Sequence, residues 1–214
     1  MQKQIRRTAL ALVLASALFA DAQTTIKFVA SEQWRNTKAY EKLGARLITP
    51  EEIMSAGLET YTPEQIKQLF EKLPSPGRFD FLGKMALKAM RDHGYVLIPV
   101  SPSEVSTSTD GWLSVRMFPI PDSFRENWEE QEKRARGTKR VPTVEELTRF
   151  ARVLWAVRGE LPFETVYVRT ANASLDGSSH VCLGGNEGGV LKIRACADSF
   201  RSDELGLAPV ARKP

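Results

Sequence analysis

The chain has 214 residues, of which 42% are hydrophobic and 26% are charged, a composition typical of a globular protein. This length suits one domain, or one domain with an extension. The formal net charge of +4 falls to about +2 when the first 22 residues are removed, because they carry three basic residues and one acidic residue. So small an excess of positive charge does not indicate nucleic acid as a partner.

The first 22 residues have the pattern of a secretory signal peptide. Three basic residues precede a short apolar run, and Ala20-Asp21-Ala22 forms an A-x-A cleavage pattern. The run is shorter than the roughly 20 apolar residues of a membrane span. We therefore predict a signal peptide over 1–22 and a mature chain that starts at Gln23. The mature protein is expected in the periplasm, outside the cell or at its surface, without a stable membrane span.

Residues 23–94 are predicted to form a mainly helical N-terminal segment. Thr49-Pro50-Glu51-Glu52 and Thr62-Pro63-Glu64-Gln65 are capping boxes with proline at the first helical position. The apolar spacing indicates a further helix over Phe79–His93. These helices fit either a small lobe of their own or an arm that packs against the next domain, and the sequence leaves both open.

Residues 95–214 are predicted to form an α+β domain. Tyr95–Val100 and Trp112–Phe118 have the composition of strands. A capping box at Ser123–Glu126 predicts the start of a charged helix, and a second box at Thr143–Glu146 predicts the start of another. The second helix has an apolar stripe that we expect to face the core: Leu147, Phe150, Ala151, Leu154 and Trp155.

The C-terminal stretch contains both cysteines and the clearest alternation of apolar and polar residues. Strands are predicted over Thr165–Arg169 and on either side of a glycine-rich turn at Gly184–Gly189. Cys182 and Cys196 lie on the parity opposite to the apolar residues of their strands, which predicts that they share the outer face of one hairpin. In an exported protein two such cysteines favour a disulfide over a metal site. Closing so short a loop would stabilise the fold by about 3 kcal/mol. The alternative is that the two cysteines are unpaired. No metal or cofactor is predicted.

Ser179-His180-Val181-Cys182-Leu183 resembles the active-site run of secreted L,D-transpeptidases, in which a histidine activates a cysteine thiolate to attack a peptide carbonyl. The resemblance implies a cysteine-dependent cell-wall transpeptidase or hydrolase that uses Cys182 and His180. The family's glycine before the cysteine is replaced by Val181, and its arginine after the cysteine is absent.

Arg140–Leu147, with the sequence RVPTVEEL, resembles the R-L-P-T-x-x-E-W opening of bacterial C-type lectin-like domains of the sulfatase-modifying and retroelement-diversified types. The closing strand of that family would correspond to Leu205–Val210. The resemblance implies a domain of short antiparallel strands with two helices, in which Tyr95–Val100 pairs with Leu205–Ala211. It does not carry over catalysis or sugar binding, because the copper-binding cysteines of the sulfatase-modifying relatives and the calcium and sugar ligands of animal lectins are missing.

The function that we expect is an exported ligand-recognition module without an evident catalytic site. Its partner would be an unknown glycan or an envelope or surface protein, and no nucleic acid. Four charged side chains near the glycine-rich turn are the predicted ligand-binding residues: Arg194, Asp198, Arg201 and Asp203. The alternatives are the cysteine enzyme described above and a structural envelope protein.

Overall fold

The computed structural model describes residue 40 and residues 45–73, 94–108, 111–136, 139–187 and 190–211. The predicted signal peptide over 1–22 and the predicted helix over 79–93 lie outside these ranges. None of the helices in the described ranges has both the length and the hydropathy that crossing a membrane requires.

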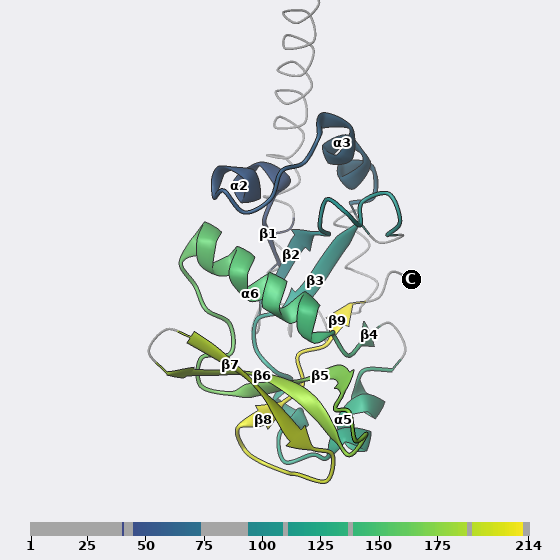
Figure 1. Ribbon diagram of the computed structural model, residues 1–214, viewed down its shortest axis with the longest axis vertical. Helices are drawn as coiled ribbons and strands as arrows, with labels where there is room; N and C mark the ends of the chain where they lie inside the picture. Colours follow the sequence, from purple (N-terminus) through teal and green to yellow (C-terminus); the bar gives the residue numbers. More distant parts are fainter. Residues whose placement is uncertain are drawn as a thin grey trace, which may run out of the picture.

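The described residues form an α+β fold, as predicted, and their strands lie in two sheets (Figure 1). The helical elements are α2 (Pro50–Ser55), α3 (Pro63–Glu71), the 3-10 turn η2 (Pro121–Ser123), α5 (Trp128–Arg134) and α6 (Val144–Arg158). The five-stranded sheet A has the order β1 (Ala45–Leu47), β2 (Tyr95–Pro99), β3 (Trp112–Arg116), β9 (Val210–Ala211), β4 (Lys139–Arg140). The four-stranded sheet B has the order β7 (Val190–Ala197), β6 (Ser179–Glu187), β5 (Tyr167–Ala173), β8 (Leu205–Gly206).

The prediction that Tyr95–Val100 pairs directly with Leu205–Ala211 is wrong. β2 and β9 share sheet A, but β3 lies between them, and Leu205–Gly206 pairs with β5 in sheet B. The predicted closing strand therefore splits in two. The reason lies at Leu207, whose amide donates to the Ser123 hydroxyl and whose carbonyl accepts from the Ile120 amide. With both backbone groups bonded to the η2 segment, this run cannot continue as one strand.

The segment before residue 95 is built into the same core as the rest. β1 pairs in parallel with β2 at the edge of sheet A, although a helical segment was predicted here. Tyr40 and Ile53 belong to one buried cluster with residues of β2, β3, α6 and β5. The described residues of this segment therefore share one hydrophobic core with the residues that follow.

Three of the four predicted capping boxes are confirmed. Thr49, Thr62 and Thr143 each accept a hydrogen bond from the third helical residue, whose side chain bonds back to the cap. The predicted start at Ser123 is wrong, because Asn127 and Glu130 form the box that opens α5. The Ser123 hydroxyl is already bonded to Ile120 and Leu207, so it is not available as a cap.

Helix α6 contributes buried side chains to the core that joins both sheets (Figure 1). Its predicted stripe is confirmed except at Trp155, which is 53% exposed, while Val153 is buried instead. At about 100° per residue, Trp155 lies a further 100° around the helix from Leu154. That position is outside the arc that α6 buries.

Candidate functional site

One face of sheet B gathers the sulfur and cationic side chains of three strands. Arg169 of β5 lies opposite Cys182 of β6, which lies opposite Arg194 of β7. His180 of β6 lies opposite Cys196 of β7. Residues opposite each other in a sheet point to the same face, so this face, which we call the cysteine face, carries all five side chains. The prediction that the two cysteines share a face is confirmed.

The prediction that this face points outward is wrong at the cysteines. Cys182 is fully buried and Cys196 is 5% exposed, in a cluster with Leu205 and Tyr167. The physical reason is that the chain folds back over the cysteine face and adds β8 beside β5. On β7 the opposite face, which was expected to be buried, is also exposed, since Ile193 there is 57% exposed.

The two cysteines are free thiols in hydrogen-bonding contact with each other. The hydrogen bond from Cys182 lowers the pKa of Cys196, and the nearby charges of Arg194 and Arg169 act in the same direction against the effect of burial. The bond to Cys196, and burial, raise the pKa of Cys182. The disulfide between them stays a prediction.

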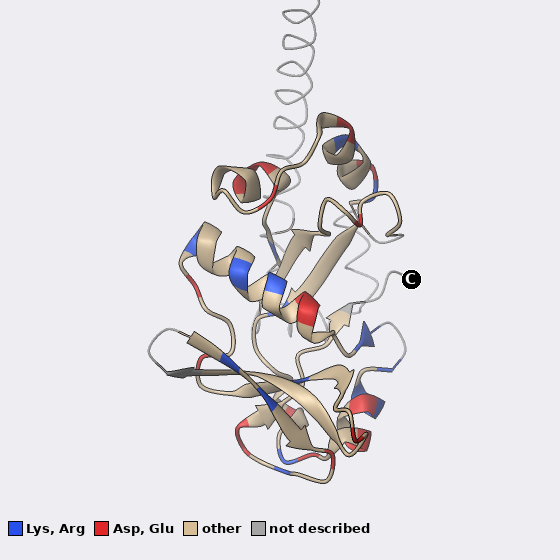
Figure 2. Ribbon diagram, in the orientation of Figure 1, with Lys and Arg blue, Asp and Glu red and all other residues tan. Residues whose placement is uncertain are grey.

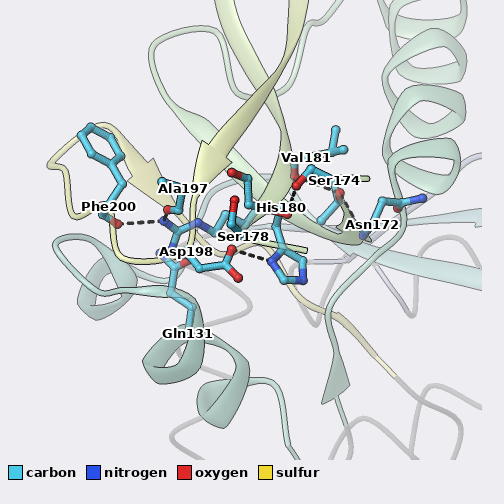
Figure 3. A network of polar contacts seen from close by, with 12 residues as sticks. Gln131, Asn172, Ser174, Ser178, His180, Val181, Ala197, Asp198 and Phe200 are labelled. Carbon is cyan, nitrogen blue, oxygen red and sulfur yellow. Dashed lines mark hydrogen bonds and ion pairs between the residues drawn. The ribbon is translucent and has the colours of Figure 1, made fainter. Parts of the chain in front are cut away.

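His180 is held in place by an aromatic ring and a carboxylate. Its Nδ1 lies 2.7 Å from Asp198 Oδ1 (Figure 3), and its ring stacks on Trp128 with centroids 3.6 Å apart. The Cys182 sulfur instead contacts the His180 backbone carbonyl, at 3.7 Å. A nucleophilic cysteine requires an accessible thiolate, and Cys182 has neither exposure nor a lowered pKa. These contacts do not support a catalytic pair made of Cys182 and His180.

Arg169 organises the chain after β7, and the sequence analysis did not identify it. It lies on the side of its strand opposite Val166 and Val168, and it is nevertheless fully buried. Its guanidinium donates to the carbonyl oxygens of Ala197 at 2.9 Å and Phe200 at 2.7 Å, and to Gln131 Oε1 at 3.3 Å. Figure 3 labels these three acceptor residues. The only signal in the sequence is a charged residue inside an apolar strand, which does not reveal what it binds.

The predicted ligand-binding residues fall into intramolecular pairs rather than one free cluster. Arg201 pairs with Glu130 at 2.7 Å, Asp203 pairs with Arg125, and Asp198 pairs with His180. The first two contacts tie residues 198–204, which we call the β7–β8 loop, to α5 and the turn before it, and the third ties the loop to β6. The pairs of Arg201 and Asp203 are exposed, and exposed ion pairs contribute only about 0–1 kcal/mol. A ligand can therefore compete for both side chains.

Arg194 lies apart from that loop and covers an aromatic ring. Its guanidinium carbon is 3.6 Å from the centroid of the Tyr167 ring, and the arginine is exposed. The Tyr167 ring packs directly against Gly185, because a Cβ there would come within 2.6 Å of the ring and its hydroxyl. The glycine-rich turn drew attention to this region of the sequence, but it did not identify Tyr167.

Comparison with protein-family models, with curated proteins and with solved structures finds no match to this chain. Within the described ranges, no group of three or more histidine, cysteine, aspartate or glutamate side chains is placed to hold a metal ion. The resemblance to C-type lectin-like domains stays a prediction.

Proposed function

We propose that this chain is an exported ligand-recognition module with a C-type lectin-like domain, which binds a glycan or an envelope or surface protein. The binding surface would comprise the Tyr167–Arg194 pair and the β7–β8 loop. The observation that carries the proposal is that pair, an exposed guanidinium stacked on an aromatic ring at 3.6 Å. The export signal in the sequence supports a partner outside the cytoplasm.

The chemistry of this surface suits recognition. An aromatic ring offers a large contact area at low entropic cost, and a guanidinium donates charge-assisted hydrogen bonds in a fixed geometry. Arg201 and Asp203 add an exposed cation and an exposed carboxylate. Together these groups offer both donors and acceptors to the hydroxyl, carboxylate or amide groups of a partner.

The loop is also held in one conformation before any ligand binds. Arg169 donates to the carbonyl oxygen of Ala197, just before the loop, and to that of Phe200 within it. The Trp128 amide donates to the Asp198 carbonyl, and the Arg125 amide donates to the Ser202 carbonyl. Ordering a loop in advance lowers the entropic cost of binding. This favours recognition by a preformed surface.

Array screening tests the proposal. The mature protein, Gln23–Pro214, is applied to glycan and envelope-protein arrays, and hits are measured by titration. We expect the combined Arg194→Ala, Asp198→Ala and Arg201→Ala variant to bind a hit at least tenfold more weakly, which corresponds to about 1.4 kcal/mol.

Two further variants keep the result interpretable. Arg194→Ala alone leaves the His180–Asp198 contact intact, and we expect it to weaken binding as well. Arg136→Ala removes an exposed arginine after α5 and serves as the control with unchanged binding. A hit whose affinity is the same for wild type and the triple variant places the site elsewhere. Cell fractionation with N-terminal sequencing tests export, and the expected first residue is Gln23.

A further inference from the structure

The strand β7 is an edge strand of unusual length for this molecule. Sheet B ends at β7 on one side and at the two-residue β8 on the other, and sheet A ends at β1 and β4, of three and two residues. β7 has eight residues. A long edge strand presents a row of backbone groups that another strand can pair with, and proteins usually shorten, bend or cover such edges.

The hydrogen-bond pattern of the hairpin decides which groups of β7 face outward. The Asp198 amide donates to the Ser178 carbonyl, and bonded pairs alternate along an antiparallel ladder. Every second residue back from Asp198, including Arg194, therefore bonds to β6. Ile193 and Ala195 therefore direct their N–H and C=O groups to the free edge, where no described strand lies beside β7.

The side chains along this edge differ between its two faces. Lys192 and Arg194 lie exposed on the cysteine face, while Ile193 and Ala195 lie exposed on the other. Figure 2 shows basic residues on β7 and no acidic ones. A matching strand would carry carboxylates at alternate positions and apolar side chains between them, because opposite charges across a strand pair are stabilising.

We propose that β7 binds an extended, acidic segment of a partner protein, which adds to sheet B as a further strand. Backbone hydrogen bonds from Ile193 and Ala195 would provide affinity, and the charges of Lys192 and Arg194 would select for carboxylates. The inference rests on the proposed function in one respect, that the chain recognises a partner at the β6–β7 hairpin. It adds the class of partner and the mode of binding.

A second copy of this chain fits the edge less well. When two β7 strands pair antiparallel about Ile193, Lys192 of each lies opposite Arg194 of the other. When they pair about Arg194, the two arginines lie opposite each other. Like charges directly opposite are destabilising, so both central registers disfavour a dimer.

The probe is a fluorescein-labelled peptide of alternating glutamate and valine, with a lysine–valine peptide of the same length as its control. Fluorescence anisotropy with the mature chain should show the glutamate peptide binding at least tenfold more tightly, and the preference should weaken as salt is raised.

Substitution at Ala195 tests the strand pairing itself. Ala195→Pro removes an outward N–H without removing a bond to β6, and edge strands accept proline at such positions. Ala195→Thr keeps the N–H and is the matched control. We expect the proline variant to bind the glutamate peptide at least tenfold more weakly and the threonine variant to bind it normally, with circular dichroism confirming that both are folded. A peptide with every amide N-methylated should not bind, and this readout requires no variant.

Three outcomes overturn the inference. If Ala195→Pro or full N-methylation leaves binding intact while Arg194→Ala weakens it, strand addition is wrong and the proposed recognition surface stands. If the glutamate peptide does not bind, the acidic partner is wrong, and the arrays still decide the proposed function. If sedimentation shows a dimer that Ala195→Pro dissociates, the occupant of the edge is a second copy.

Discussion

The Arg169 guanidinium lies beneath the β7–β8 loop and donates to the Phe200 carbonyl oxygen at 2.7 Å. Arg169 is fully buried, and its other hydrogen bonds also go to uncharged oxygens, those of Ala197, Gln131 and Glu126. Hydrogen bonds to a charged group are worth about 1.5–3 kcal/mol each. The position of the loop therefore depends on a side chain 31 residues earlier in the chain.

Replacing Arg169 should loosen the β7–β8 loop. We expect Arg169→Met to lower the free energy of unfolding by about 3 kcal/mol, because the oxygens of Phe200, Ala197 and Gln131 each lose a hydrogen bond from the guanidinium. Hydrogen exchange should show faster exchange in residues 198–204 than in β2. Arg201→Met, which removes an exposed arginine from the same loop, should cost less than about 1 kcal/mol. Equal effects of the two substitutions would contradict the role given to Arg169.

The Glu59–Arg149 pair should make stability depend on pH. Burial raises the pKa of Glu59, but the hydrogen bonds and charge of Arg149, with Tyr61 and Arg152, outweigh it, so the pKa lies below its ordinary value of 4.5. The stabilisation is thus present above about pH 4.5 and is lost as the pH falls through the folded-state pKa. We expect Glu59→Gln to cost about 2 kcal/mol at pH 7.

Urea denaturation at several pH values provides the measurement. The difference between wild type and Glu59→Gln should shrink as the pH falls below 4.5. Glu71→Gln changes an exposed carboxylate of α3 and should show a small difference at every pH. A Glu59→Gln difference that is constant down to acid pH would rule out this linkage.

Because we propose that the protein is exported, we expect its cysteine pair to be oxidised. Because both thiols are buried, alkylation of the folded protein does not distinguish a disulfide from shielded thiols. Intact mass is therefore compared after alkylation in denaturant, with and without prior reduction. We expect two alkyl groups only after reduction, and a loss of about 3 kcal/mol for the Cys182→Ser and Cys196→Ser double variant. Two alkylated thiols in unreduced exported protein would refute the disulfide.

Gly185 should control the position of the Tyr167 ring. Gly185 and Gly177 both have positive φ, at 63° and 66°, but a Cβ at Gly185 meets Tyr167 at 2.6 Å while one at Gly177 meets nothing within 4 Å. We expect Gly177→Ala to cost about 1 kcal/mol from backbone strain. Gly185→Ala should cost about 1–3 kcal/mol more.

The same two variants also test the proposed binding surface. Displacing Tyr167 separates it from Arg194, so Gly185→Ala should weaken the binding of an array hit or of the acidic peptide, whereas Gly177→Ala should not. Thermal unfolding and titration of both variants provide the comparison. Equal stability of the two variants would show that the ring moves aside without cost.

Much of the local structure follows from the sequence alone. Capping boxes at Thr49, Thr62 and Thr143 predict three helix starts, because the bonds that form them lie within four residues of chain. The alternation of side chains along each strand likewise predicts that Cys182 and Cys196 share one face, because alternation is a local property of the strand backbone. The α+β class and the β6–β7 hairpin also follow from local patterns of this kind, but the turn predicted over Gly184–Gly189 begins too early, because β6 continues through Gly184 to Glu187.

Which face is covered, and what each charge contacts, is decided only by the tertiary structure. Cys182 and Cys196 are buried because Leu205 of β8 and Tyr167 pack against them, and Arg169 is buried where the carbonyls of Ala197 and Phe200 accept its hydrogen bonds. The splitting of the closing strand depends on bonds from Leu207 to a segment more than 80 residues earlier. Local periodicity indicates which side chains share a face. Burial depends on which distant segments pack against that face, and a short sequence pattern carries no information about those segments.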